Sequence, residues 1–130
     1  ASSIQFGHEY NGWESWTNLP HEHQKMMNLL RKTRAEGVVF ISGDVHWGEI
    51  SKRQLAPNYP LYDVTSSGLN REWPTVEPNR FRVGEVYREH NYGRIRINWK
   101  SERPQVVLAI VGIDGQAKSE VSLELPSLSF

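Results

Sequence analysis

The sequence predicts a single α/β unit of the α+β-like kind, in which a mixed β-sheet packs against one main helix. Three observations lead to this prediction: a run with helical spacing at 20–36, a short all-apolar run at 38–41, and alternating runs later in the chain. A chain of 130 residues has room for one domain and can bury a core without disulfides. We therefore expect residues 1–130 to form one unit.

The main helix is expected at residues 20–36. Pro20 suits the first helical position, and Glu22 lies in the first turn, where a negative charge is favourable. Gly37 is expected to end the helix in a left-handed conformation. One stripe with helical spacing should face the core, and it consists of Met26, Leu29, Leu30 and Thr33.

Strands are expected on both sides of this helix. Residues 1–6 alternate between polar and apolar and predict a first strand. The run "VVFI" (38–41) is apolar at every position, which favours a strand covered on both faces in a parallel or mixed sheet. Residues 68–92 are expected to be irregular. Further alternating or apolar runs predict strands at 61–68, 92–99, 105–113 and 117–125, with a hairpin turn at Asp114-Gly115.

Composition excludes several classes of function. The chain has 15 basic and 15 acidic side chains, and this zero net charge argues against a nucleic-acid or membrane-surface binder, which needs a basic excess. No apolar run approaches the length of a membrane span. The chain has no cysteine, which excludes disulfides, thiolate metal sites and cysteine nucleophiles. Any metal must therefore be bound by oxygen and imidazole ligands.

The stretch "ISGDVHWGEI" (41–50) places two carboxylates and an imidazole where the apolar strand ends. In open α/β sheets, ligands bind beyond the carboxyl ends of the strands. If the chain stays extended here, Asp44 and His46 project to the same side and can reach one cation or two adjacent ones. Glu49 is close enough to accept a hydrogen bond from the free ring nitrogen of His46, and Trp47 could shield the site. The spacing also allows a structural role, with Asp44 capping a turn and His46 half-buried.

Four more residues are candidates for substrate contact. Ser66 and Ser67 end a strand in a small-residue loop, but no base is visibly paired with them, so a serine-hydrolase interpretation is weak. Arg71 could bind phosphate, for which arginine is favoured, and Trp73 could form a pocket wall. Each of the four also has a plain structural interpretation, as part of a turn, a solvated side chain or an anchor for a loop.

The loop at residues 7–20 is rich in turn residues, and long loops of this kind usually cover a core or carry function. Trp13 and Trp16 are interpreted as structural covers. Glu14 is interpreted as a possible outer acid near the site.

Several pieces of the sequence match one known family, in the same order along the chain. They are "SSIQ", "W-x-x-W-x-N-x-P-x-E", "GVVFISGDVHWGEIS", "YPLYDVTSSGL", "NYGRIRINW" and a closing strand pair with "IDG". Together they resemble the alkaline phosphatase D family, or PhoD-like metallophosphatases, of the calcineurin-like metallophosphoesterase superfamily. The resemblance covers essentially the whole chain. It implies that residues 1–130 are the C-terminal portion of a catalytic domain built as a four-layer αββα sandwich.

The resemblance also implies a function. Gly43-Asp44-Val45-His46 matches the last metal motif of the superfamily, with aspartate in place of its first histidine. Asp44 and His46 would then be catalytic metal ligands, with Ca²⁺ suited to the aspartate and Fe³⁺ or another transition metal suited to the histidine. The activity implied is that of a phosphoric ester hydrolase, an alkaline phosphatase or phosphodiesterase, acting through two metals on a small-molecule or polymeric phosphate ester. The family suggests a secreted or periplasmic location in bacteria.

The earlier metal motifs of that family are not found in the chain. Two ligands cannot hold a two-metal cluster, because Ca²⁺ alone takes about six to eight oxygen ligands. We therefore expect the chain to be inactive alone and to need the remainder of the catalytic domain upstream. Two other functions stay open at this point: a non-catalytic β-rich binding module that keeps the scaffold, and a hydrolase that binds a single ion.

Overall fold

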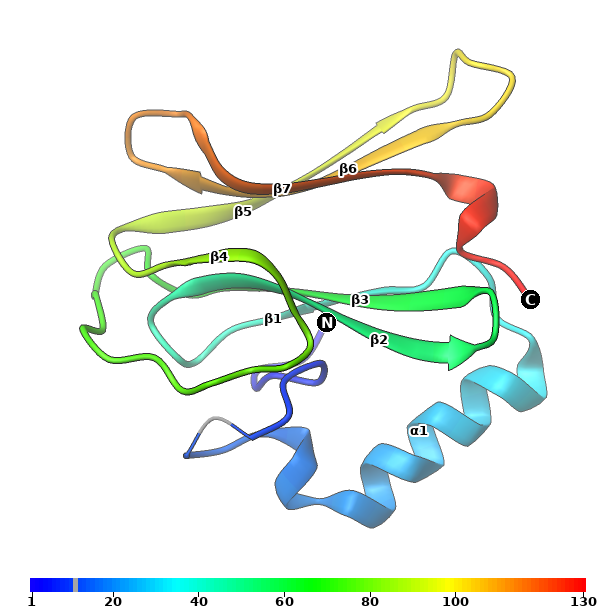
Figure 1. The fold of residues 1–130 in the computed structure, drawn as a ribbon, viewed down its shortest axis with the longest axis horizontal. Helices are drawn as coiled ribbons and strands as arrows, with labels where there is room; N and C mark the ends of the chain where they lie inside the picture. Colours follow the sequence, from blue (N-terminus) through cyan, green and yellow to red (C-terminus); the bar gives the residue numbers. More distant parts are fainter. Residues whose placement is uncertain (11) are drawn as a thin grey trace.

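The computed structural model describes residues 1–10 and 12–130 and contains two β-sheets and one main helix. The first sheet has the strand order β1-β3-β2-β4, and the second has β5-β6-β7. The first sheet lies between the second sheet and α1 (Figure 1). The elements are η1 (Trp16–Asn18), α1 (Pro20–Thr33), β1 (Val39–Ser42), β2 (Gly48–Ala56), β3 (Tyr59–Ser66), β4 (Arg82–Tyr87), β5 (Asn91–Asn98), β6 (Gln105–Gly112), β7 (Ala117–Glu124) and η2 (Leu125–Ser127).

The predicted combination of a mixed sheet with one main helix is confirmed. β1 runs parallel to β3, in a register that pairs Ile41 with Val64, and β2 runs antiparallel to β3. Because β1 and β3 are parallel, their carboxyl ends lie at the same end of the sheet. The loops 43–47 and 67–81 both leave from this end, at the left of Figure 1.

The helix ends at Thr33, earlier than the predicted boundary at residue 36. Arg34 adopts a left-handed conformation (φ 50°), and the Ala35 amide donates to the Leu30 carbonyl at 3.1 Å. This hydrogen bond closes the last turn as in a Schellman motif. Gly37 is also left-handed (φ 68°), but it lies in the loop that follows and not at the helix end.

The buried face of α1 differs from the predicted stripe. The helix begins at Pro20, as predicted, but its buried residues are Met27 and Leu30. Met26 is only partly buried against the core, and Leu29 is 52% exposed. With two adjacent methionines, helical spacing is compatible with either of two faces, and packing against the first sheet decides between them.

β1 lies at an edge of its sheet, and the prediction that it is covered on both faces was wrong, because its side chains are only partly buried or exposed before Ser42. Its one partner in the sheet is β3, and Ile41 is 45% exposed. On the other side of β1, the Ser2 amide donates a hydrogen bond to the Ile41 carbonyl at 2.9 Å. The predicted strand at 1–6 is also absent from the described residues, where only an isolated bridge joins Gln5 to Ser15.

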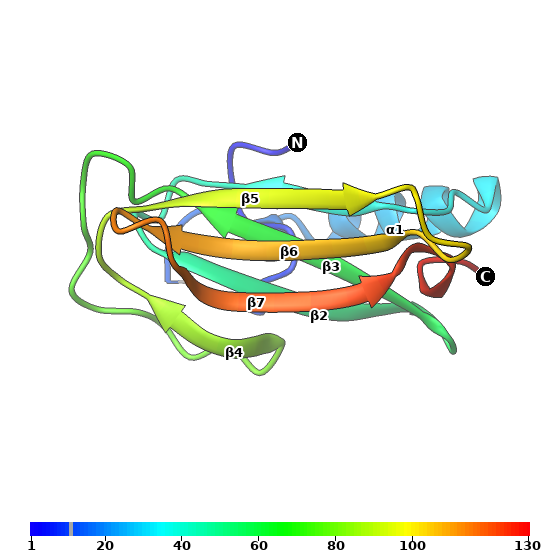
Figure 2. The same cartoon turned by 90° about the horizontal axis from the view of Figure 1, so that it is seen from above.

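The second sheet follows the sequence closely. β5, β6 and β7 are antiparallel neighbours, and a tight turn with a left-handed Gly115 (φ 74°) joins the last two, as predicted. Two strands were not predicted. β2 was not assigned, and β4 lies within the stretch 68–92 that was expected to be irregular. Figure 2 shows the second sheet stacked over the first, with β4 beside β7.

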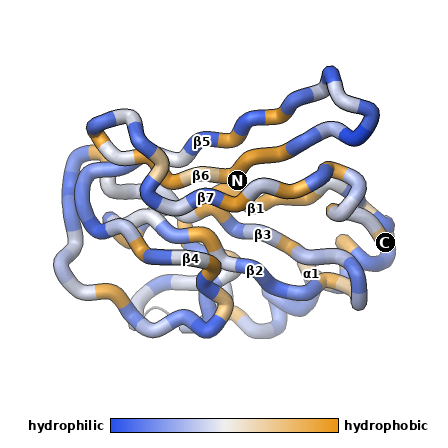
Figure 3. The backbone as a smooth tube through the Cα atoms, turned by 45° about the horizontal axis from the view of Figure 1, so that its top comes forward, coloured by the Kyte–Doolittle hydropathy of each residue, from blue (hydrophilic) through white to orange (hydrophobic). Residues whose placement is uncertain are grey.

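The core lies mainly between the two sheets. Ile50 and Val64 point into it from the first sheet, and Leu108 and Ile110 from the second, and all four are buried. Hydrophobic colour follows β6 and parts of β1 and β3 in Figure 3, whereas the connecting loops are mostly hydrophilic. The scaffold therefore holds its loops at the carboxyl ends of β1 and β3 on a packed base. Among the described residues, no helix is both long and apolar enough to cross a membrane.

Candidate functional site

The loop between β1 and β2 has an unusual backbone. Asp44 (φ 77°) and His46 (φ 63°) both adopt left-handed conformations. The chain is therefore not extended through this loop, which was the condition for both side chains to project to the same side. A left-handed conformation costs roughly 1–2 kcal/mol for a residue with a Cβ atom, and such strain tends to occur at functional sites. The two side chains nevertheless line the same pocket.

Hydrogen bonds tie this loop to the one that follows β3. The His46 amide donates to Ser67 Oγ at 2.9 Å, and the Ser67 amide donates to the Trp47 carbonyl at 3.3 Å. Ser66 Oγ donates to Asn91 Oδ1 at 3.1 Å. The two predicted serines thus lie beside the loop and are engaged in structural contacts, with Ser67 helping to impose the bent backbone.

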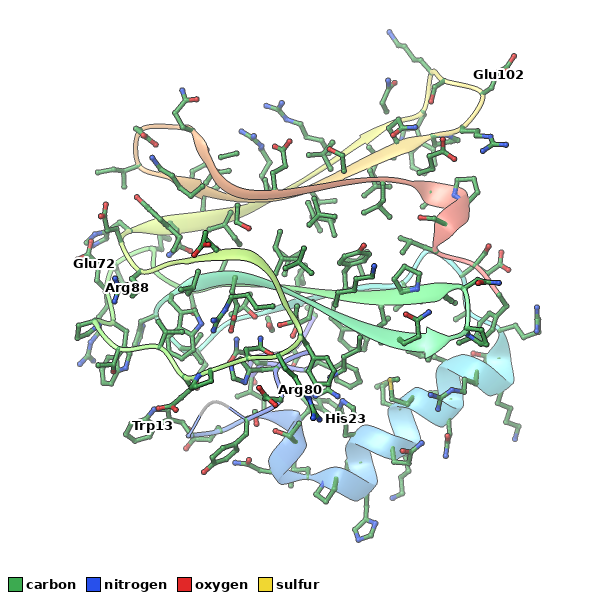
Figure 4. All side chains as sticks on the ribbon, viewed as in Figure 1. Trp13, His23, Glu72, Arg80, Arg88 and Glu102 are labelled. Carbon is green, nitrogen blue, oxygen red and sulfur yellow. The ribbon has the colours of Figure 1, made fainter. Side chains whose placement is uncertain are left out.

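The pocket beside the loop has a volume of about 180 Å³. The Trp73 ring lies with its centroid 6.2 Å from that of His46, and Trp13 meets Trp73 at 6.2 Å with the two planes at 89°. Figure 4 places Trp13 on the loop before α1. The lining residues are Trp13, Glu14, Asp44, Val45, His46, Trp47 and Trp73.

Three of these lining residues, Glu14, Asp44 and His46, have the chemistry of metal ligands, and the last two were predicted as ligands. Nδ1 of His46 is buried and has no hydrogen-bond partner among the described residues, and Asp44 is exposed at the pocket. An imidazole nitrogen without a partner beside a carboxylate fits a metal-binding role. However, no group of three or more His, Asp or Glu side chains in residues 1–10 and 12–130 is arranged to hold a metal ion. The pair therefore fits as part of a donor set that needs further ligands.

Glu49 does not contact His46 in the way the sequence suggested. It lies in β2, where the alternation of side chains turns it toward the N-terminal segment, and it is fully buried. Four donors surround its carboxylate: Gln5 Nε2 (2.8 Å) and Trp47 Nε1 (3.0 Å) on Oε1, and Arg82 Nε (2.6 Å) and Asn79 Nδ2 (3.2 Å) on Oε2. Glu49 therefore supports the loop through Trp47, whose side chain is itself buried.

The electrostatics of Glu49 depend on two basic neighbours. Nε2 of His8 lies 3.5 Å from Oε1, and Nδ1 of the same ring accepts a hydrogen bond from the Tyr10 amide at 3.0 Å. His8 is thus neutral with its proton on Nε2, and burial lowers its pKa. Burial alone would raise the pKa of Glu49, but the Nε2–H group of His8 that faces the carboxylate, the Arg82 charge and the donated hydrogen bonds outweigh it and lower the pKa. Arg82 is the permanent positive charge of this cluster.

The arginines near the site have different surroundings. Arg71 lies over the Trp73 ring, with its guanidinium carbon 5.6 Å from the ring centroid. It does not belong to the residues that line the pocket, so the structure places it next to a pocket wall and not inside the pocket. Arg82 pairs with Glu49, and Arg80 pairs with Glu9 at 3.3 Å.

One pocket residue, Trp13, was not among the predicted site residues, and Glu14 was predicted only as a possible outer acid. Trp13 was interpreted as a cover, but it is 57% exposed and forms a wall of the pocket. The signal in the sequence was the concentration of tryptophans in the loop before α1. Spacing along the chain could not show that this loop meets the segment around Trp73.

Comparisons with known proteins add no assignment to this geometry. No family model, no curated protein and no solved structure matches the chain. The interpretation of the site therefore depends on the residues of the chain itself.

Proposed function

We propose that this chain is part of a metal-dependent phosphoesterase of the PhoD-like type, in which Asp44 and His46 bind metal ions at a two-metal site. One observation carries the proposal: both side chains converge on one pocket at the carboxyl ends of a parallel strand pair, through a strained loop. Open α/β sheets bind their ligands at this place. The unpartnered Nδ1 of His46 supports the same role.

The two ligands differ in the metal that each favours. Asp44 offers hard oxygen atoms, which suit Ca²⁺, and His46 offers an imidazole nitrogen, which suits Fe³⁺ or another transition metal. Metal ions held there would act as Lewis acids toward the phosphoryl oxygens and activate water. The chain contributes a preorganised loop, because Ser67 accepts a hydrogen bond from the His46 amide and donates one to the Trp47 carbonyl.

The remaining ligands are proposed to come from strands that pair with the open edge beside this loop. β1 and β5 are edge strands of their sheets, and Ile95 and Ile97 of β5 are each 41% exposed. Their partners in β6 are buried between the sheets, so these isoleucines border the uncovered side of the core. A cavity of about 560 Å³ opens along this side, and its lining includes Ile41, Gly43 and Ile95. Unpaired apolar edges of this kind invite pairing with further strands. Added strands would end next to Asp44 and His46, and they would complete the four-layer sandwich of the PhoD-like type.

The experiment measures hydrolysis of p-nitrophenyl phosphate and bis-p-nitrophenyl phosphate with Ca²⁺ and Fe³⁺ added. It compares this chain alone with the chain joined to any polypeptide encoded ahead of it in the same reading frame. We expect hydrolysis only in the longer form, and we expect Asp44→Ala and His46→Ala each to abolish it. Glu120→Ala, at an exposed position on β7, is the matched control and should leave hydrolysis unchanged.

Two results would contradict the proposal in different ways. Absence of metal-dependent hydrolysis in the longer form would reject the enzyme. Turnover by the chain alone that depends on Asp44 would reject the requirement for ligands from added strands.

A non-catalytic binding module is the second candidate, because no group of three or more donors among the described residues is arranged to hold a metal ion, and the open edge is largely apolar. Titration with metal ions, monitored by calorimetry, separates the two candidates. If the chain is a binding module, His46→Ala should not change metal binding by the longer form. If it is the enzyme, His46→Ala should abolish metal binding.

A further inference from the structure

The pocket beside Asp44 and His46 has aromatic walls that metal binding does not explain. We infer that it binds a quaternary ammonium group, carried by the alcohol part of the phosphate ester. The assignment to an ester depends on the proposed function, but binding of the cation itself does not. The pocket residues that lead to this inference are Trp13, Trp73, Glu14 and Asp44.

The geometry of the two indoles suits a cation. The planes of Trp13 and Trp73 stand at 89°, so the rings form a corner and not a stack. The His46 ring is tilted by 37° to Trp73 and continues this wall toward the metal ligands. Cations are attracted to the faces of aromatic rings, most strongly to tryptophan, and aromatic cages that bind quaternary ammonium groups use this interaction. In this structure Trp73 already contacts one cation, the guanidinium of Arg71.

The charge of the pocket favours a positive ligand. Its lining includes two carboxylates, Glu14 and Asp44, and no lysine or arginine from the described residues. A primary ammonium group would require several hydrogen-bond acceptors around it, because it carries three donors. The indole rings cannot accept such bonds in plane, and Asp44 is assigned to the proposed metal site, which leaves Glu14 as the one carboxylate of the lining for an ammonium group. A quaternary ammonium group needs no acceptor. The mixture of tryptophan walls with an acidic rim therefore fits a trialkylammonium group better than a lysine-like amine.

The position of the pocket fits a zwitterionic phosphodiester. His46 takes part both in the proposed metal site and in the aromatic wall. A phosphate at Asp44 and His46 would therefore lie next to an ammonium group in the corner of Trp13 and Trp73. A phosphocholine-type ester has this arrangement of one negative and one positive group a few bonds apart.

In the test, the metal-free chain is titrated with choline and with 3,3-dimethylbutan-1-ol, which is the neutral carbon isostere of choline. Binding is monitored by calorimetry and by tryptophan fluorescence. We expect saturable binding of choline that is at least about tenfold tighter than binding of the isostere. Trp13→Leu and Trp73→Leu should each weaken choline binding by about tenfold. Trp99→Leu is the matched control, because Trp99 is 66% exposed and lies after β5, outside the pocket residues.

Circular dichroism and urea unfolding show whether each variant folds, and Trp73→Phe retains an aromatic face and should restore part of the affinity. Equal affinity for choline and the isostere would overturn the inference, and so would absence of choline binding by the folded chain. Choline binding without phosphoesterase activity in the longer form would reject the proposed function and leave the cation site standing. Hydrolysis without a preference for a choline ester over a methyl ester would retain the enzyme and reject this substrate.

Discussion

Replacing Glu49 with alanine is expected to destabilise the chain strongly. The side chain is fully buried and accepts hydrogen bonds from four side chains. Its loss would leave the charge of Arg82 without its partner, and the Arg82 side chain is only 19% exposed. Removing one partner of a buried ion pair typically costs about 3–5 kcal/mol.

The hydrogen bonds lost in Glu49→Ala lead to a similar estimate of the destabilisation. A buried donor without an acceptor costs about 1–3 kcal/mol, and Gln5, Trp47 and Asn79 would each lose an acceptor. These costs overlap with the ion-pair term, because water or a rearranged side chain would satisfy some of the donors. We therefore expect a loss of about 4 kcal/mol in the free energy of unfolding for Glu49→Ala. Glu49→Gln retains the shape and one oxygen acceptor, so we expect about half of this loss.

Urea unfolding followed by tryptophan fluorescence measures the effect, and linear extrapolation gives the free energies. Glu85→Ala serves as the control, because Glu85 is exposed on β4 in the same sheet and should change stability by less than about 0.5 kcal/mol. Trp47 donates directly to Glu49, so the folded-state fluorescence of Glu49→Gln should also change. A loss below about 1 kcal/mol for Glu49→Ala would refute the idea that this network supports the loop.

Two further predictions concern backbone strain and pH. Asp44→Gly removes the left-handed strain at that position (φ 77°), so its free energy of unfolding, measured in urea, should exceed that of Asp44→Ala by about 1 kcal/mol. A glycine variant less stable than the alanine variant would argue against strain. Burial lowers the pKa of His8 below its ordinary value of 6.5, so below that pH the unfolded chain binds more protons than the folded chain. The stabilising effect of a neutral His8 is therefore complete above pH 6.5 and decreases as the pH falls toward the lowered pKa. Urea midpoints should fall between about pH 7.5 and pH 5.5, and less so in His8→Asn, which keeps an acceptor for the Tyr10 amide; an unchanged pH dependence in that variant would exclude this role.

The parts of the fold that the sequence predicted correctly are those with a strong local pattern. The strict alternation in "YGRIRINW" and the Asp114-Gly115 turn determine β5 and the hairpin of β6 and β7. β4 has no such pattern, because charged residues and Gly84 interrupt it, and its pairing with β2 forms the strand. β1 shows the opposite case. Its apolar run indicates a buried strand, but only the arrangement of the sheets reveals that it lies at an edge.

The same difference between local pattern and tertiary arrangement applies to the candidate site. The spacing of Asp44 and His46 led us to expect that both reach one place if the backbone is extended, and both do line one pocket, but through a different backbone. The actual backbone is bent at both residues, because Ser67 from another strand end holds the His46 amide. The sequence could not predict the role of Glu49 either, because its partners Gln5 and Arg82 lie far from it in the sequence and contact it only in the folded chain.

The contacts around the loop suggest how positioning and chemistry are separated in this chain. Ser67 holds the loop at the His46 amide, and Glu49 holds it through the Trp47 indole, but neither contact uses the carboxylate of Asp44 or the Nδ1 atom of His46. Strain at two residues can persist only if surrounding contacts determine the backbone more strongly than the local preference does. The two anchors, Ser67 and Glu49, provide those contacts. Loss of the Glu49 anchor should therefore allow the pocket to relax while both proposed ligands remain in the chain, which distinguishes a positioning defect from the loss of a ligand.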